Sequence, residues 1–194
     1  MAMTFGIHIG CPALTAFGLP FERIGVREDM KVSEFAGKHF QLNDARNNPK
    51  PLRRRLPIWI GGLGETRTLQ AAAKYADGWN APYIGPEQWR QKNAILDDWC
   101  AKVGRDPGGI RRTVNVGFYM GADARGAARG EKIYQSHFGK DPRTGFVRGT
   151  ARDAVELIAR YRDAGVHRVN IAFRQGPYDW DALHAYAEEV VAKG

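Results

Sequence analysis

From residue 56 onward, short apolar runs alternate with amphipathic segments, and this alternation constrains the fold more than any other feature. The apolar runs predict strands, and the segments between them place apolar residues at helical spacing. The predicted strands are residues 57–60, 78–81, 113–120 and 169–173. The predicted helices are residues 66–76, 87–103, a segment that begins at 151, and 179–192. Four strand–helix units in succession predict an α/β fold with a parallel sheet, either open or closed into a barrel.

Each predicted helix has an apolar face that we expect to point toward the sheet. In the first helix this face consists of Leu69, Ala72, Ala73 and Ala76. In the second it consists of Trp89, Leu96, Trp99, Cys100 and Val103, and in the last of Trp180, Leu183, Ala187 and Val190. We expect the tryptophans to belong to the core: Trp59, Trp79, Trp89, Trp99 and Trp180.

Two further segments complete this half of the chain. Residues 121–147 are polar and rich in alanine and glycine, which predicts a loop with one helix inside it. Thr150 and Asp153 resemble a capping box, with Asp in place of the usual Glu or Gln, at the start of the third helix.

The first 55 residues lack this alternation. Residues 4–9 fit a strand, but Pro12, Gly18, Pro20 and Gly25 interrupt the sequence that follows, and residues 35–42 predict a short extended arm. The chain therefore predicts one domain, 1–194, with an irregular N-terminal region, 1–55, before the regular part, 56–194.

The composition excludes several classes of protein. The chain of 194 residues is 43% hydrophobic and 26% charged, as in ordinary water-soluble domains, and no apolar run reaches the roughly 20 residues that span a bilayer. No export signal is recognisable at residues 1–10, and Cys11 and Cys100 have no metal-ligand spacing. We expect a cytoplasmic protein with no bound metal and no membrane partner.

The net charge of +8 admits three explanations: nucleic-acid binding, an anionic small ligand, or a basic solvated surface. The densest basic run is Arg53–Arg55, and it has no zinc pattern, aromatic-rich recognition motif or heptad repeat beside it. Because charge alone is non-specific, we expect a solvated face and no nucleic-acid partner.

The segment "IGGLGET", residues 60–66, joins a predicted strand to a predicted helix through a glycine loop. Exposed N–H groups and the positive end of a helix favour phosphate at such a position, and glycine permits close approach of a ligand. Thr66 and Thr68 offer hydroxyls at the start of the helix, and a helix cap is the alternative role for Thr66. The loop has neither the G-x-G-x-x-G pattern nor the lysine of a Walker motif, so a tight turn without a ligand is the alternative.

"PIWIGGLGETRTLQAAAKYADGWN" resembles the fifth strand and the following segment of the bacterial luciferase-like superfamily, especially its coenzyme F420-dependent oxidoreductases. "GKHFQLNDARNNPKP" resembles the arm before that strand, and "AFGLPFERIGVREDM" the segment after the fourth strand. "LDDWCAKVGRDP" and "FVRGTARDAVELIARYRDAGVHRVNIAF" are similar to a later helix and to the eighth strand–helix unit. The resemblance covers roughly residues 14–192.

Members of this superfamily are eight-stranded (β/α) barrels that bind a flavin or deazaflavin at the carboxyl ends of the strands. The resemblance implies a flavin- or deazaflavin-dependent oxidoreductase acting on a small organic substrate, with coenzyme F420 as cofactor and FMN as the alternative. It implies that main-chain groups of five residues contact the phosphate region of the cofactor: Ile60, Gly61, Gly62, Leu63 and Gly64. The other possibility is a shortened, non-catalytic homologue that binds a flavin-like ligand or only associates with itself.

A barrel of this type takes about 250 residues, whereas this chain has 194. We therefore expect a partial or rearranged TIM-type (β/α) barrel, with the C-terminal four strand–helix units, residues 56–194, forming a half-barrel. Residues 4–9 fit the first barrel strand and, almost as well, the fourth. Open sheet edges and an uncovered inner face would then favour a homodimer.

The sequence identifies no catalytic acid or base. His8, near the end of the first predicted strand, is the one candidate, with a rim or core position as its alternative. Arg148 and Arg174 follow predicted strands and are candidates for an anionic group. Neither a nucleophile elbow nor a zinc motif is present in the sequence.

Overall fold

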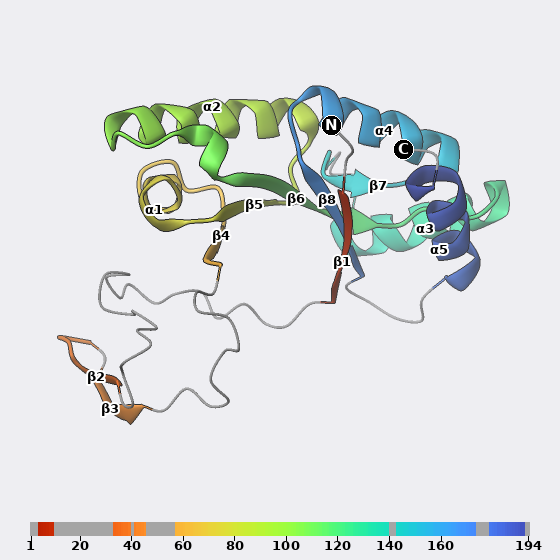
Figure 1. The fold of residues 1–194 in the computed structure, drawn as a ribbon. Coiled ribbons are helices and arrows are strands. Elements are labelled where there is room, and N and C mark those ends of the chain that lie inside the picture. Colours follow the sequence, from red (N-terminus) through yellow and green to blue (C-terminus); the bar gives the residue numbers. More distant parts are fainter. Residues whose placement is uncertain are drawn as a thin grey trace. The chain divides into compact units, whose positions relative to one another are not determined.

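The computed structural model describes residues 4–9, 33–39, 41–45, 57–139, 143–173 and 179–192. The chain divides into two compact units, one formed by Met1–Cys11 with Trp59–Gly194 and the other by Pro12–Ile58 (Figure 1). In the second unit, strands β2 (Ser33–Ala36) and β3 (Gln41–Ala45) form an antiparallel pair. The first unit contains the other elements, and it groups the strand at residues 4–9 with the C-terminal half of the chain.

Six strands form the sheet of the first unit: β1 (Thr4–Ile9), β4 (Trp59–Gly61), β5 (Gly78–Pro82), β6 (Arg111–Phe118), β7 (Phe146–Val147) and β8 (Arg168–Phe173). The helices are α1 (Thr68–Tyr75), α2 (Pro86–Lys102), α3 (Ala124–Phe138), α4 (Ala151–Asp163) and α5 (Trp180–Ala185). A 3-10 turn, Pro107–Gly109, follows α2, and a π-helical segment, Tyr186–Val191, continues α5. The predicted alternation of parallel strands and helices is confirmed.

The strands lie in the order β1-β8-β6-β5-β4, and every pair along this path is parallel. The short strand β7 pairs with Gly117 and Phe118 of β6, beyond the point where β5 ends. Strand β8 lies in the segment that resembles the eighth strand–helix unit, and the first strand of an eight-stranded barrel pairs with the eighth. The pairing of β1 with β8 therefore favours the first position for residues 4–9. A fourth barrel strand would instead lie beside β4.

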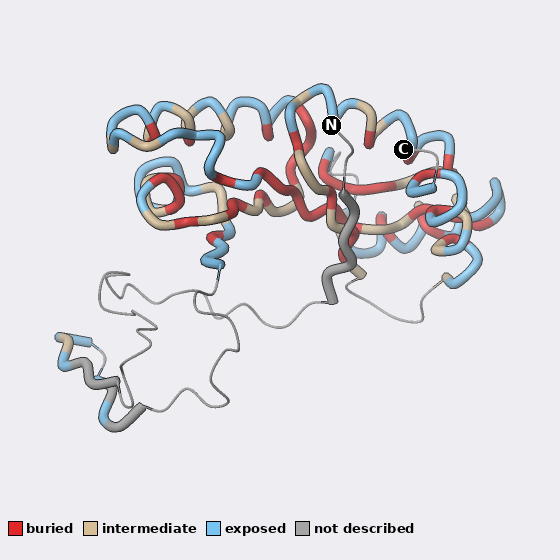
Figure 2. Tube along the Cα trace, viewed as in Figure 1, coloured by how far each residue is buried: buried red, intermediate tan, exposed pale blue. Residues whose placement is uncertain are grey.

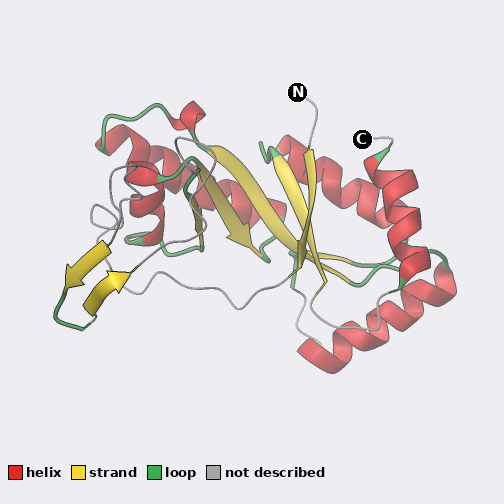
Figure 3. Ribbon diagram, turned by 60° about the horizontal axis from the view of Figure 1, so that its bottom comes forward, coloured by secondary structure: helices red, strands yellow, loops and turns green. Residues whose placement is uncertain are grey.

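The two faces of the sheet have different compositions. Residues that are opposite each other in a parallel pair share a face, and successive residues of a strand alternate. Trp79, Arg112 and Phe118 lie on the outer face, where Trp79 contacts Trp89 of α2 and Phe118 contacts Tyr186 after α5. The central strands β5 and β6 are mostly buried, and the helices alternate between buried and exposed residues (Figure 2). Figure 3 shows the sheet between the helices from a second direction.

The apolar face predicted for the first helix is confirmed, since Leu69, Ala72, Ala73 and Ala76 are fully buried. The prediction for the last helix is wrong at two positions, because Trp180 is 62% exposed and Ala187 is exposed. Val190 is buried as predicted, and Ala182 and Tyr186 are buried in addition. Their spacing of four residues places them on one helical face, which differs from the predicted face at Trp180 and Ala187.

The predicted capping box is present at the start of α4. The Asp153 carboxylate accepts hydrogen bonds from the Thr150 N–H at 2.7 Å and from the Thr150 hydroxyl at 3.0 Å. These bonds hold the pKa of Asp153 below its ordinary value. The aspartate therefore replaces the longer Glu or Gln of the usual motif without loss of the contact.

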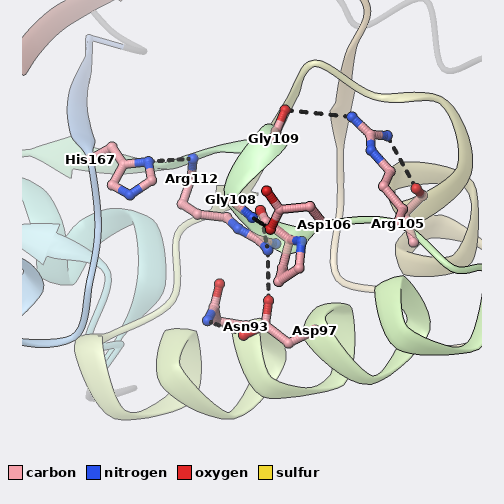
Figure 4. Close-up of polar contacts among 10 residues, drawn as sticks. Asn93, Asp97, Arg105, Asp106, Gly108, Gly109, Arg112 and His167 are labelled. Carbon is pink, nitrogen blue, oxygen red and sulfur yellow. Dashed lines mark hydrogen bonds and ion pairs between the residues drawn. The ribbon is translucent and has the colours of Figure 1, made fainter.

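A polar cluster ties α2 to the amino-terminal end of the sheet (Figure 4). The buried guanidinium of Arg112 donates from Nη2 to Asp97 Oδ1 at 2.6 Å and to the carbonyl oxygen of Pro107 at 3.2 Å. Asn93 Nδ2 donates to the second Asp97 oxygen at 3.0 Å. The cluster therefore neutralises an arginine charge on the outer face of β6, where the rest of the packing is apolar.

Replacement of Asp97 by Ala should destabilise the fold, because the buried guanidinium of Arg112 then loses its carboxylate. Hydrogen bonds to charged groups are worth about 1.5–3 kcal/mol, and the Asp97 side chain is 42% exposed, so we expect the lower part of that range in urea unfolding. The control is Glu156→Ala, which removes an exposed i,i+4 partner of Arg152 and should cost less than about 0.5 kcal/mol. Equal losses for the two variants would contradict a structural role for the cluster.

His167 belongs to the same end of the sheet. Its Nδ1 accepts a hydrogen bond from the Arg112 backbone N–H at 3.1 Å, which requires an unprotonated Nδ1. Burial, followed by the charges of Arg112 and Arg111, lowers the pKa of His167 below its ordinary value of 6.5. The unfolded chain therefore binds a proton on His167 more readily than the folded chain does. The contribution of His167 to the free energy of unfolding is fully present above the pKa of the unfolded chain, and it is lost as the pH falls toward the pKa of the folded chain.

We expect the thermal midpoint of the protein to fall between pH 7 and pH 5.5. His167→Asn keeps an acceptor oxygen and removes the titration, so its midpoint should fall less over the same interval. The pKa values of Glu87 and Asp153 are also lowered, but these carboxyl groups change the stability only at more acidic pH. If the thermal midpoints of the wild type and of His167→Asn fall equally with pH, another group causes the loss of stability.

Candidate functional site

The glycine loop between β4 and α1 begins at the carboxyl end of the sheet. Gly62 has φ +130°, a backbone conformation that side-chain-bearing residues rarely adopt. Its N–H donates to the carbonyl oxygen of Asn80 at 3.1 Å, and its own carbonyl oxygen accepts a hydrogen bond from Trp79 Nε1 at 2.9 Å. Both polar groups of Gly62 are therefore bonded to the neighbouring strand β5.

The following residues of the loop are held by the helices. Leu69 N–H donates to the Gly64 carbonyl oxygen at 3.0 Å, and Trp99 Nε1 donates to the Glu65 carbonyl oxygen at 2.7 Å. Lys92 pairs with the Glu65 carboxylate at 2.6 Å. This ion pair compensates the one acidic charge of the loop, which would otherwise oppose an anion.

The amides of Leu63 and Gly64 differ from that of Gly62. Within the described part of the chain, neither N–H donates a hydrogen bond to the protein. Leu63 is half-buried and Gly64 is exposed, so both can be reached from outside the chain. Side chains leave little room at the base of the loop, since a Cβ on Gly62 would lie 3.1 Å from Thr68 Cγ2 and one on Gly64 2.9 Å from Thr68 Oγ1.

These features fit an anionic group such as phosphate. Two unbonded amides precede the positive end of α1, and glycine allows a ligand to approach the backbone closely. The contacts of Gly62 and Glu65 hold the loop in one conformation, so little ordering is required on binding. Among the described residues, no group of three or more His, Cys, Asp or Glu side chains is arranged to hold a metal ion.

The predicted cofactor-binding residues occupy different parts of this loop. Ile60 is 7% exposed on the outer face of β4, and Gly61 ends that strand. Thr66 is exposed, the residue before α1 is Arg67, and this helix has no side-chain cap, so a capping role for Thr66 is wrong. Thr68 is the threonine that lies against Gly62 and Gly64. Cofactor contacts by Ile60, Gly61, Gly62, Leu63, Gly64 and Thr66 stay a prediction.

The other candidates lie elsewhere. His8 pairs in register with Ala172, one residue before the end of β1. Arg148 binds Glu131 through two hydrogen bonds, at 2.9 Å and 3.0 Å, and lies over the ring of Tyr134. Its charge is therefore already paired. Arg174, Cys11 and the run Arg53–Arg55 fall outside the described residues.

An aromatic cluster at the same end of the sheet was not predicted. Tyr83, after β5, has φ +53°, which is unusual for a bulky residue, and its ring stacks on Phe146 at 5.7 Å between centroids. Phe146 covers Gly117, where a Cβ would overlap its ring. Tyr119 contacts Phe146 and shares a hydrogen bond of 3.2 Å with His137 Nδ1. The sequence gives little indication of this cluster, because strand β7 has only two residues and lies in a segment whose composition predicts a loop.

The model of the luciferase-like monooxygenase family matches residues 24–145, more than half of the chain. The chain belongs to this family. No curated protein sequence matches it. The match includes the glycine loop, helices α1–α3 and strands β4–β6. The suspected superfamily is thereby confirmed.

Solved structures show the same fold at low sequence identity. An F420-dependent secondary alcohol dehydrogenase in complex with an F420–acetone adduct is 18% identical, with a TM-score of 0.65 over 86% of this chain and 57% of that one. The coenzyme F420-dependent tetrahydromethanopterin reductase from Methanopyrus kandleri is 16% identical, with a TM-score of 0.62 over 83% and 58%. A long-chain alkane monooxygenase is 16% identical, with a TM-score of 0.59 over 84% and 46%. The chain thus spans less than three fifths of the length of these relatives.

Trp99→Phe should loosen the loop while it keeps the aromatic ring that Lys102 covers. The variant loses the hydrogen bond to Glu65, worth about 0.5–1.5 kcal/mol, so we expect inorganic phosphate or FMN to bind about 2- to 10-fold more weakly in calorimetry. Trp180→Phe, an exposed tryptophan on α5, is the control and should leave binding unchanged. Unaltered affinity in Trp99→Phe would mean that the loop is held without this contact.

Proposed function

We propose that the chain binds a flavin or deazaflavin at the carboxyl end of its sheet and takes part in the oxidation or reduction of a small organic substrate. The observation that carries the proposal is the glycine loop, which has two unbonded amides before α1 and a preorganised backbone. Membership of the luciferase-like monooxygenase family supports the reaction class.

In this proposal the amides of Leu63 and Gly64 and the positive end of α1 bind the phosphate of the cofactor. Ile60, Gly61 and Gly62 approach it through main-chain atoms, and the hydroxyls of Thr66 and Thr68 are available at the start of the helix. The cofactor, when bound, supplies hydride transfer. The chain would position the cofactor, because contacts of the loop with β5 and α2 hold the phosphate site at the carboxyl end of the sheet.

We place coenzyme F420 first and FMN second as the cofactor. The sequence segments that carry the resemblance favour the F420-dependent branch. The names of two similar structures also contain F420, although their identities of 18% and 16% support only a shared fold. Titration of the pure protein with each cofactor in turn decides between them.

The second candidate is a non-catalytic homologue that binds a flavin-like ligand or only itself. The observation that favours it is the sheet, in which the described strands take five consecutive barrel positions from the fifth to the first. Catalysis in a complete barrel uses residues from several strand ends. Cofactor binding without turnover by any donor–acceptor pair would favour this candidate.

Gly62→Val separates cofactor binding from the fold. Valine at φ +130° is strained by about 1–3 kcal/mol, and its Cβ would press on Thr68, so the loop must move away from the ligand position. We expect cofactor affinity to fall at least about 10-fold in a fluorescence titration, with the protein still folded by circular dichroism. Gly61→Ala is the matched control, because a Cβ there meets Asn80 O at an ordinary 3.7 Å. Equal affinity in Gly62→Val and the wild type would contradict the proposal.

We also propose a cytoplasmic homodimer. None of the described helices has both the length and the apolar character needed to cross a bilayer. Among the described strands, β4 pairs only with β5 and β1 only with β8, so both ends of the sheet are open to pairing. Trp59 on the edge strand β4 is 44% exposed, so its predicted core position is wrong.

Light scattering across a dilution series should give the mass of two chains, since one chain is 21.6 kDa. Trp59→Asp should shift the equilibrium toward the monomer, because a charge on an apolar edge strand opposes pairing. Trp180→Asp, at a second exposed tryptophan, is the control. A stable monomer of the wild type at micromolar concentration would exclude the homodimer.

A further inference from the structure

The inner face of the sheet is polar where a barrel interior is usually filled with Val, Ile and Leu. The registers place one set of residues from β5, β6 and β8 on this face: Gly78, Asn80, Pro82, Arg111, Thr113, Asn115, Gly117, Arg168, Asn170 and Ala172. None of them is a branched aliphatic residue. Their neighbours on the outer face include Trp79, Val114, Val116, Val169 and Ile171.

Four of the inner residues form a row of hydroxyl and carboxamide groups, which we name the amide row: Asn80, Thr113, Asn115 and Asn170. The Thr113 hydroxyl lies 3.0 Å from the Trp79 carbonyl oxygen and 2.8 Å from Asn80 Oδ1. Asn170 Nδ2 donates to Asn115 Oδ1 at 3.1 Å. The row therefore crosses three adjacent strands in two hydrogen-bonded pairs.

Each pair leaves one half of a carboxamide unused. Among the described residues, Asn80 Nδ2 and Asn170 Oδ1 have no hydrogen-bond partner. Both side chains are half-buried, whereas Thr113 is fully buried and Asn115 is 7% exposed. A carboxamide that is half removed from water gains free energy when a ligand supplies the missing bond.

The row adjoins the glycine loop. Asn80 is opposite Gly61 in the sheet, and its carbonyl oxygen accepts the Gly62 N–H. At the other side, Phe146 covers Gly117, which is two residues beyond Asn115 on the same face. A ligand anchored at the loop can therefore extend along the row toward the aromatic cluster.

We propose that the amide row binds a polyhydroxylated chain. A hydroxyl both donates and accepts, so it satisfies the unused donor of Asn80 and the unused acceptor of Asn170 alike. The two Cα atoms are separated by two strand spacings and two residues along the strand, about 12 Å. A chain of about five hydroxylated carbons has this reach with a hydrogen bond at each end. An unsubstituted alkyl chain would leave both amides unpaired.

Two kinds of ligand contain a polyhydroxylated chain: a flavin or deazaflavin, through its sugar-alcohol chain, and a hydroxylated substrate. The first rests on the proposed function, and the second requires only the amide row. The shared test uses ribitol, which has five hydroxyls, and 1-pentanol, which has the same chain length and one hydroxyl. Binding is followed through the side-chain NH₂ resonances of Asn80, Asn115 and Asn170 in ¹⁵N NMR.

Ribitol should shift these three resonances, and 1-pentanol should not. Asn170→Leu should weaken ribitol binding about 3- to 10-fold, as expected for one lost hydrogen bond. Gln88→Leu, which removes an exposed carboxamide from α2, is the matched control and should bind as the wild type does. Asn80→Leu is the second variant, should Asn170→Leu fail to fold.

The source is decided by repeating the ribitol titration with FMN present. Competition by FMN assigns the row to the chain of the cofactor, and binding of ribitol to the FMN complex assigns it to a substrate. Ribitol binding to a protein that binds neither FMN nor F420 would refute the proposed function and leave this inference intact. Equal shifts by ribitol and 1-pentanol, no shift by ribitol, or full affinity in both Asn variants would overturn it.

Discussion

The indole of Trp79 connects the glycine loop to strand β5 and helix α2. Its ring is fully buried on the outer face of β5 and contacts Trp89 of α2 at 5.6 Å between centroids. Its Nε1 donates to the carbonyl oxygen of Gly62, and the next residue, Asn80, accepts the Gly62 N–H. Two consecutive residues of one strand thereby fix both polar groups of the glycine that starts the loop. Because the Gly62 carbonyl and the Leu63 N–H belong to one planar peptide group, the bond from Trp79 also fixes the direction of the Leu63 N–H.

The two faces of the sheet differ in role: the outer face packs the core, and we propose that the inner face binds a ligand. Its outer face packs against helices through apolar side chains, with the Arg112–Asp97 pair as the polar exception. Its inner face has hydroxyl and carboxamide groups in place of the aliphatic layers of a closed barrel. The loop follows β4, and the amide row begins at Asn80 on the adjacent strand β5, so one extended ligand can contact both. In the two proposals above, the loop binds the phosphate of such a ligand and the amide row binds its hydroxylated chain.

Regular elements with a clear period could be predicted from the sequence. Helix α1, strand β5 and the capping box at Thr150 follow local rules, and the fold class followed from their succession. Strand β7 and the aromatic cluster could not be predicted, because two residues carry no period and the contacts join distant segments. The pairing of β1 with β8 is a matter of topology, which the sequence "FGIHIG" does not contain. Within the loop, the glycines and the hydroxyls of Thr66 and Thr68 could be located from the sequence. The packing of Thr68 against Gly62 and Gly64 could not, because it depends on where α1 starts.

Leu63 and Gly64 have unbonded amides, and we propose that these amides bind an anion. The most direct measurement is a titration of ¹⁵N-labelled protein with inorganic phosphate, followed through backbone amide shifts. We expect saturable shifts at Leu63 and Gly64, with a smaller change at Gly62, whose N–H is bonded to Asn80. Shifts confined to surface lysines and arginines, with these two amides unmoved at saturation, would contradict the proposal.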